Sequence, residues 1–301
     1  MPEGIIVKAL SGYYFVRPAD GGEVLRCRAR GVFKLRGVSP LVGDRVRFEA
    51  TGGGEGTVLE VLPRSSELVR PPVANVDLAV LVFSVVRPEL NLALLDKFLV
   101  HVEHKRLDAL IVFTKVDAVG QVPDPDRVRA QLEEACRLYG AIGYPYVRTS
   151  ALQGEGLEEL RARLAGRIAV FAGQSGVGKS TLLNALVPGL ALETGEISEK
   201  LGRGRHTTRH VELIRLPGGG LVADTPGFSQ LDFRELGVDE IGGCFREFRP
   251  LAAECRFRGC THLSEPGCAV RAAVESGGVA DSRYRHYAEF LAEWKELRRR
   301  Y

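Results

Sequence analysis

One stretch constrains this chain more than any other, the glycine-rich run Gly173-Gln174-Ser175-Gly176-Val177-Gly178-Lys179-Ser180. It fits the pattern G-x-x-x-x-G-K-[ST], which surrounds phosphate groups with backbone N–H donors. The apolar run 167–172 predicts a buried strand before it, and residues 181–187 predict a helix after it, whose N-terminus is also favourable for anions. We expect Lys179 to reach the β- and γ-phosphates and Ser180 to hold Mg²⁺. The alternative is a glycine-rich turn before an ordinary helix.

The composition is that of a soluble globular protein large enough for two or three domains. The 301 residues are 45% hydrophobic and 26% charged. No apolar run approaches the roughly 20 residues of a membrane helix, and the first residues do not resemble a signal peptide. We therefore expect a cytoplasmic protein without membrane contact. In a reducing cytoplasm its six cysteines would not form a disulfide framework.

Residues 1–66 predict an all-β domain. Five short segments rich in β-branched and aromatic residues are separated by turn sequences such as 19–22 and 51–54. Such a series favours a small barrel of the OB type, a fold that often binds nucleic acid through aromatic and basic side chains. This region carries the whole positive excess, with 10 Lys and Arg against 7 Asp and Glu. Candidates for a binding face are Tyr13, Tyr14, Phe15, Arg26, Arg28, Arg30, Lys34 and Arg36, which could equally be core aromatics and solvated arginines.

The pattern changes after a segment rich in proline and charge, 62–72, which predicts a linker. From 67 to 230 apolar strands alternate with helices, and this predicts a mostly parallel sheet with helices on both faces. One of these helices is predicted to begin at Asp124 and to end at Gly140. Residues 231–301 predict a third, helical domain that ends in a charged amphipathic helix.

Two further motifs indicate a guanine nucleotide. Asp224-Thr-Pro-Gly227 follows an apolar strand, where the aspartate can hold Mg²⁺ through water and the glycine N–H can face a γ-phosphate. Thr114-Lys115-Val116-Asp117 follows another strand. The Asp117 carboxylate would accept from both the N1–H and the N2 amino group of guanine, whereas adenine presents an acceptor at N1. The Lys115 stem would lie along the base.

The order of these motifs is permuted relative to ordinary GTPases, in which the phosphate-binding loop (the P-loop, here Gly173–Ser180) comes first. Here the 114–117 motif and Ser150-Ala151-Leu152, which would contact guanine through its backbone, precede the P-loop, and the 224–227 motif follows it. The same sheet forms if the old termini are joined near 156–166, a change that domains tolerate when their termini are close. Movement after Gly227 would then reach the C-terminal domain directly.

The loop before Asp224 carries the candidate switch and catalytic residues. Within 202–209 we expect Thr208 to reach Mg²⁺ and the γ-phosphate, with Thr207 as the alternative. Phe228 stands where many GTPases carry a glutamine that orients water, and an apolar side chain cannot do so. His206 is the nearest polar candidate for this catalytic role, and a loop histidine without a role is the alternative. The pattern predicts slow intrinsic hydrolysis that depends on a partner.

A cysteine and histidine cluster near the C-terminus indicates a structural zinc site. Cys255, Cys260, His262 and Cys268 supply three sulfurs and one imidazole, a complete tetrahedral set without an open position. Cys244 is a possible substitute ligand. Buried cysteines without a metal are the alternative, but the surrounding Gly, Pro and Thr leave little core to bury them.

Together these features resemble the bacterial circularly permuted GTPases of the RsgA/YjeQ type, which act in small ribosomal subunit biogenesis. The resemblance covers essentially the whole chain. It implies GTP hydrolysis to GDP and phosphate, stimulated by the small (30S) subunit late in its maturation, contact of the OB domain with ribosomal RNA, and release after hydrolysis. It places the GTP contacts at Thr114–Asp117 and Gly173–Thr181, the zinc ligands at Cys255, Cys260, His262 and Cys268, and the proposed catalytic histidine at His206. Many relatives have asparagine at the position of Thr114, so we expect weaker nucleotide binding here.

Two other functional classes fit parts of the pattern. One is a nucleotide-gated RNA-binding switch with negligible turnover, which multiple-turnover phosphate release with and without small subunits would distinguish from an enzyme. The other is a P-loop ATPase or kinase, against which Asp117 argues and which nucleotide competition would test. For all of these we expect a monomer.

Overall fold

The computed structural model describes residues 1–31, 33, 39–69, 72–190, 192, 211–224, 233 and 236–299. The chain divides into two compact units, Met1–Val80 with Ser150–Phe228 and Leu81–Thr149 with Ser229–Tyr301. The boundary between the units passes through strand β8 (Leu78–Ser84). Within the described ranges, no helix combines the length and the apolar character that crossing a bilayer requires.

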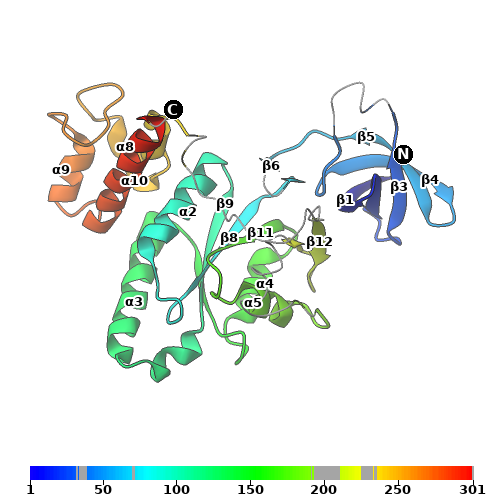
Figure 1. Cartoon of the computed structure of the whole chain (residues 1–301), viewed down its shortest axis with the longest axis horizontal. Helices are drawn as coiled ribbons and strands as arrows, with labels where there is room; N and C mark the ends of the chain where they lie inside the picture. Colours follow the sequence, from blue (N-terminus) through cyan, green and yellow to red (C-terminus); the bar gives the residue numbers. More distant parts are fainter. Residues whose placement is uncertain are drawn as a thin grey trace. The chain divides into compact units, whose positions relative to one another are not determined.

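The first unit begins with the predicted barrel, formed by β1 (Glu3–Leu10), β2 (Tyr13–Pro18), β3 (Leu25–Ala29), β4 (Arg45–Gly52) and β5 (Glu55–Val61) (Figure 1). The strands pair in the order β1-β2-β3-β5-β4, and β4 returns to β1 through three antiparallel pairs, which closes the barrel. The β3–β5 pair is parallel. Alternate side chains fill the interior, namely Ile6, Val16, Cys27, Val46, Phe48 and Val58.

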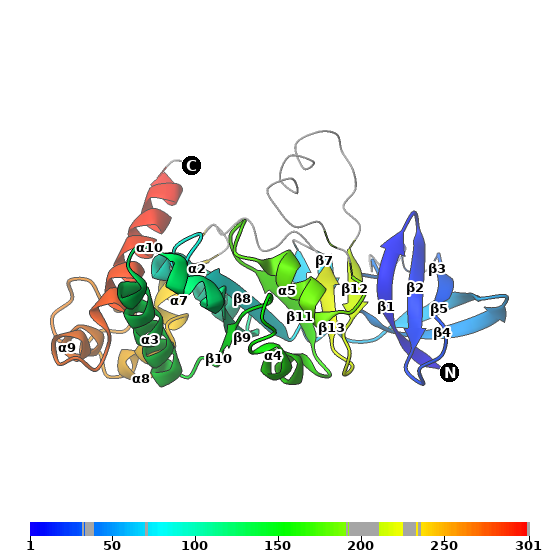
Figure 2. The ribbon, with the colours of Figure 1, turned by 90° about the horizontal axis from the view of Figure 1, so that it is seen from below.

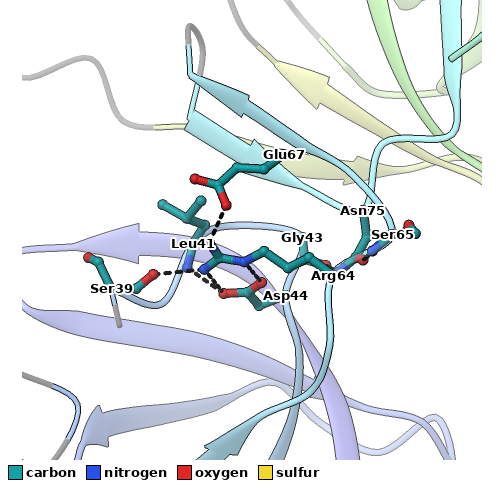
Figure 3. A network of polar contacts seen from close by, with 8 residues as sticks. All are labelled: Ser39, Leu41, Gly43, Asp44, Arg64, Ser65, Glu67 and Asn75. Carbon is teal, nitrogen blue, oxygen red and sulfur yellow. Dashed lines mark hydrogen bonds and ion pairs between the residues drawn. The ribbon is translucent and has the colours of Figure 1, made fainter. Parts of the chain in front are cut away.

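The segment predicted as a linker is instead a hydrogen-bonded connection centred on Arg64 (Figure 3). Its guanidinium donates to both oxygens of the fully buried Asp44 carboxylate, at 2.7 and 2.8 Å. It also donates to the Ser39 carbonyl at 2.8 Å and pairs with Glu67 at 2.6 Å. A segment rich in proline and charge is usually a solvated linker, but here the charged Arg64 side chain is held by the buried Asp44 carboxylate of the barrel.

Two short strands continue this connection, β6 (Glu67–Val69) and β7 (Pro72–Ala74), which pair with each other in antiparallel fashion. Asn75, with a left-handed backbone at φ 56°, follows them and is buried. Its side chain accepts from the Ser65 N–H and donates to the Gly43 carbonyl, both at 2.9 Å (Figure 3). The barrel loop and the chain leading to β8 are therefore joined by hydrogen bonds of the Asn75 side-chain amide as well as by the ion pairs of Arg64.

The rest of the first unit contains the P-loop strand and its neighbours. Strand β11 (Ile168–Ala172) is buried throughout and pairs in parallel with β13 (Leu221–Asp224), and β12 (Glu212–Arg215) pairs antiparallel with β13. The Asp77 N–H donates to the Ile168 carbonyl at 3.0 Å, which places the start of β8 beside β11. Helices α4 (Leu157–Leu164) and α5 (Lys179–Leu186) flank β11 in the sequence.

The second unit begins with the end of β8, then α2 (Leu92–His104), β9 (Asp108–Thr114), the 3-10 helix η1 (Val116–Gln121), α3 (Pro125–Ile142) and β10 (Tyr146–Thr149). Strands β9 and β10 are parallel, as predicted. The side chains of Asn91 and Asp124 cap α2 and α3. The predicted end of the second helix at Gly140 is wrong, because Gly140 continues the helix and Gly143, at φ 94°, ends it.

The C-terminal part is helical, as predicted, with α7 (Val238–Gly243), η4 (Arg246–Phe248), α8 (Arg249–Ala252), α9 (Ala269–Glu275) and α10 (Asp281–Arg299). Helix α10 packs against α2 and α7 (Figure 2). An aromatic core fills this region, and it includes Phe233, Phe245, Phe248, Tyr287 and Phe290. The single tryptophan, Trp294 on α10, donates its indole N–H to the Leu236 carbonyl at 2.7 Å.

Candidate nucleotide site and metal centre

The P-loop is an open turn between a buried strand and a helix N-terminus. Gly173, Gly176 and Gly178 have φ values of 145°, 79° and 97°, which side chains with a Cβ rarely adopt. Residues 174–176 are exposed, and Val177 is buried and anchors the turn. Helix α5 begins at Lys179, directly after this loop, and the positive end of a helix dipole favours an anion such as a phosphate group there.

Lys179 folds back over this loop. Its ammonium group donates to the carbonyls of Gly173 and Gln174, both at 2.7 Å. The lysine and the first α5 residues, Ser180 and Thr181, are half-buried, so their polar ends stay near the loop without being sealed into the core. A phosphate in the turn would offer Lys179 a stronger, charged acceptor than two carbonyls.

Asp224 ends the strand beside the P-loop strand. The parallel register pairs Ile168 with Leu221 and Val170 with Ala223, so Asp224 emerges one residue beyond the last pair, at the same edge as the P-loop. Carboxyl ends of parallel strands are where α/β sheets bind ligands. This strand register is compatible with the Mg²⁺ role of Asp224, which stays a prediction.

The base motif begins at the last residue of β9. Thr114 is buried, and its hydroxyl donates to the Phe83 carbonyl at 3.3 Å. Lys115 has a left-handed backbone at φ 62°, and its ammonium donates to the Arg87 carbonyl. Burial lowers the pKa of Lys115, and the positive charge of Arg87 lowers it further. Val116 and Asp117 start η1, with Asp117 half-buried.

The 150–152 motif follows β10, whose last residue Thr149 pairs with Thr114. Ser150 is fully buried, and its hydroxyl accepts from the Gln153 N–H at 3.1 Å. The Ser150 N–H donates to the backbone carbonyl of Glu155, which closes a tight turn. Leu152, at the tip of this turn, is 82% exposed. The P-loop and Asp224 belong to the first unit, and Thr114–Asp117 belongs to the second.

The four predicted metal ligands come together in one cluster. The Cys255, Cys260, His262 and Cys268 ligand atoms all lie within 4.8 Å of one another. His262 Nδ1 is 3.6 Å from Cys255 Sγ and 3.4 Å from Cys268 Sγ, and the two sulfurs are 4.0 Å apart. A tetrahedral zinc ion would require S···S distances of about 3.8 Å and S···N distances of about 3.5 Å. The cluster therefore fits a tetrahedral metal ion.

The surroundings of the cluster fix its loop. Burial lowers the pKa of His262, which favours the neutral ring that binds metals. The Tyr284 hydroxyl donates to the His262 carbonyl at 2.7 Å, and the Tyr287 hydroxyl donates to the Thr261 carbonyl at 2.5 Å. Cys244, the substitute ligand, does not join the cluster but lies in the aromatic core, and burial raises the pKa of its thiol to about 12.

Several predicted residues lie outside the described part of the chain. They are the candidate catalytic His206 and Thr208, the alternative Thr207, Gly227 and Phe228, and the basic Lys34 and Arg36. In the barrel, Tyr13 and Phe15 pair with Arg28 and Arg26, whereas Tyr14 pairs with the buried Cys27. Because side chains alternate along a strand, Tyr14 does not share the outward face of Tyr13.

Comparison with known proteins covers the whole chain. The family described as RsgA N-terminal domain matches residues 3–58, and the RsgA GTPase family matches residues 61–234. The small ribosomal subunit biogenesis GTPase RsgA of Geobacillus thermodenitrificans is 54% identical over 301 residues, and that of Bacillus cytotoxicus is 51% identical, each alignment covering 100% of both chains.

Two solved structures share the fold over nearly the whole chain. YloQ, described as a circularly permuted GTPase, superposes with a TM-score of 0.85 at 42% identity over 99% of this chain and 96% of its own. YjeQ from Thermotoga maritima superposes with a TM-score of 0.87 at 38% identity, over 97% and 98%. With its permuted motif order, its closed barrel and full-length relatives at about half identity, the chain belongs to the RsgA family of circularly permuted GTPases.

Proposed function

We propose that this GTPase acts in late maturation of the small ribosomal subunit, that the bound subunit stimulates GTP hydrolysis, and that the protein is released afterwards. The full-length relatives are named small ribosomal subunit biogenesis GTPases. The observation that carries the proposal is the open P-loop beside the carboxyl end of β13, in a chain that also holds an aspartate in a base-recognition loop. This combination supports a nucleotide-dependent cycle rather than a static RNA-binding module.

In this cycle the P-loop residues Gly173–Thr181 bind the phosphates, and Ser180, Thr208 and Asp224 hold Mg²⁺. Thr114–Asp117, Ser150 and Ala151 select guanine. Mg²⁺ would neutralise the charge that develops on the phosphate oxygens, and His206 would orient the attacking water. We propose three domains, residues 1–66, 67–230 and 231–301. The metal ion proposed for the Cys₃His cluster is zinc, because three thiolates and one imidazole suit it.

The barrel is the proposed contact with ribosomal RNA. The guanidinium groups of Arg26 and Arg28 lie 5.0 and 4.9 Å from the centre of the Tyr13 ring, on the outward face of β2 and β3. An aromatic ring with two cations can stack on a base and neutralise phosphates. The metal loop offers a second such group, since Phe257 is 45% exposed and lies between the exposed Arg256 and Arg258. We place the protein in the cytoplasm, as a monomer.

The test is the rate of GTP hydrolysis by the full chain, titrated with purified small ribosomal subunits. The proposal expects slow intrinsic turnover, strong stimulation by subunits, and loss of the stimulated rate in His206→Ala. Absence of stimulation would overturn the ribosomal role, and binding ATP more tightly than GTP would overturn the nucleotide assignment. Stimulated turnover that survives in His206→Ala would reject only the histidine.

A further inference from the structure

The turn that follows β8 is built around a buried serine. Ser84 is 1% exposed, and its hydroxyl oxygen accepts from the backbone N–H groups of Val86 at 3.3 Å and Arg87 at 3.1 Å. Serine hydroxyls hold tight turns by this kind of local hydrogen bond. The orientation of the peptide groups around Arg87 is therefore set by a side chain inside the protein.

Three contacts join this turn to the first two residues of the base motif. The Thr114 hydroxyl donates to the Phe83 carbonyl, and the Val85 N–H donates to the Thr114 carbonyl at 3.1 Å. The Lys115 ammonium donates to the Arg87 carbonyl. A hydroxyl, a backbone carbonyl and an ammonium group of the motif are thus all engaged by the same five-residue segment, 83–87.

These contacts have a consequence for Lys115. Its backbone is held in the left-handed region, which is unfavourable for a residue with a side chain unless the surroundings impose it. Its ammonium is fixed at the other end by a carbonyl, so the four methylene groups between them are restrained. A lysine stem restrained in this way presents apolar surface, while its charge is satisfied elsewhere.

We propose that the Ser84–Arg87 turn is a positioning element for guanine recognition, which tethers the Lys115 ammonium to the Arg87 carbonyl and leaves the lysine stem to pack along the base. This inference rests on the proposed role of Thr114–Asp117 as the base motif. The Thr114 hydroxyl, which donates to the Phe83 carbonyl, fixes the start of the same motif. Preorganising a binding loop raises affinity because less ordering remains to be done on binding.

The experiment measures dissociation constants of GDP and of ADP for the full chain by calorimetry. Ser84→Ala removes the acceptor of both N–H groups that set the turn, and we expect GDP binding to weaken about threefold to tenfold, the scale of a net hydrogen-bond contribution. ADP binding should not weaken in parallel, so the GDP preference falls. Ser84→Thr keeps the hydroxyl and should restore GDP affinity. Ser66→Ala, which removes a hydroxyl bonded to the Val76 carbonyl, is the matched control and should leave GDP affinity unchanged.

A double-mutant cycle separates positioning from a general loss of stability. Lys115→Met keeps the stem and removes the tether, and we expect Ser84→Ala with Lys115→Met to bind GDP no more weakly than Lys115→Met alone. Additive effects, or unchanged GDP affinity in Ser84→Ala, would overturn the inference. If the wild-type chain itself prefers ADP, the base motif assignment fails instead, so the two failures are distinguishable.

Discussion

Arg283 on α10 and Asp96 on α2 form an ion pair in which both side chains are inaccessible to solvent, with exposures of 1% and 0% and a separation of 2.6 Å. Glu247 accepts two further hydrogen bonds from the same guanidinium, and Tyr139 and His286 donate to the same aspartate. Every charge of the pair is thus satisfied by fixed partners, which is the condition under which buried ion pairs are tolerated.

Removing one member of this pair leaves an uncompensated buried charge. We expect Arg283→Ala to destabilise the C-terminal helices by about 3–5 kcal/mol. Arg285→Ala is the matched control, because Arg285 lies two positions away and makes an exposed pair with Asp281 that is worth about 0–1 kcal/mol. Urea unfolding followed by Trp294 fluorescence reports this region, since Trp294 is the single tryptophan. Equal effects of the two variants would contradict the expectation.

The role of Arg283 could not be predicted from the sequence. Helix 281–299 carries charged residues along its whole length, and nothing local separates Arg283 from Arg285. Their difference comes from partners that are distant in the sequence, Asp96 and Glu247. Arg64 escaped prediction for the same reason, because its partner Asp44 lies in the barrel and the local composition resembled a linker.

Features that depend on a few contiguous residues were predictable. The P-loop, the strands of the barrel and the metal ligands are set by local backbone conformation and spacing, and the fold confirms the barrel and the permuted GTPase architecture. The contribution of Ser84 was missed because a serine at a strand end has no signature of its own. Its importance depends on the carbonyl of Arg87 meeting Lys115, a contact across 28 residues.

Loss of a metal ligand should release the ion and disorder the loop. We expect the wild-type chain to retain one zinc per molecule and Cys268→Ser to lose it, because the remaining donors no longer complete a tetrahedron. Cys244→Ala is the control, since Cys244 lies in the aromatic core, and should keep its zinc. Elemental analysis after dialysis against a chelator measures the content. If Cys268→Ser retained zinc and Cys244→Ala lost it, Cys244 and not Cys268 would be the fourth ligand.

Guanine selection should depend on the Asp117 carboxylate. In Asp117→Asn an amide replaces the carboxylate and can no longer accept from two adjacent donors, so we expect GTP affinity to fall about tenfold or more. Xanthine presents an acceptor where guanine has its amino group, and xanthosine triphosphate should therefore gain affinity in this variant. Asp126→Asn, on the exposed start of α3, is the control. Competition binding measures both nucleotides, and an unchanged ranking would remove Asp117 from the site.

Glu265 should make the metal loop sensitive to acid. The Thr261 hydroxyl and nearby backbone N–H groups donate to its carboxylate and lower its pKa to about 2. A folded-state pKa below the ordinary value of about 4.3 stabilises the fold above that value, and the contribution is lost as the pH falls towards 2. The difference in unfolding free energy between wild type and Glu265→Gln should therefore be constant from pH 5 to about pH 8. Below about pH 5 this difference should become smaller. A difference independent of pH would contradict this.

Gly43 should be irreplaceable in the connection between the barrel and β7. Its φ is +91°, and a Cβ built there would lie 2.1 Å from the Ala74 carbonyl oxygen. Neither backbone segment can move away easily, because both are held by hydrogen bonds. The Gly43 N–H donates to the Ile6 carbonyl and the Ala74 N–H donates to the Val42 carbonyl, both at 2.8 Å. We expect Gly43→Ala to cost about 2–5 kcal/mol, the sum of overpacking and left-handed strain.

Gly53→Ala separates these two contributions, since Gly53 also has a positive φ, 62°, but open space around it. It should show only the strain, about 1–2 kcal/mol. Because Trp294 reports the other unit, hydrogen exchange of the β1 and β7 amides is the measurement. Faster exchange in both strands is expected for Gly43→Ala alone. If Gly53→Ala accelerates exchange there as much, the close approach of Gly43 to Ala74 does not hold this connection together.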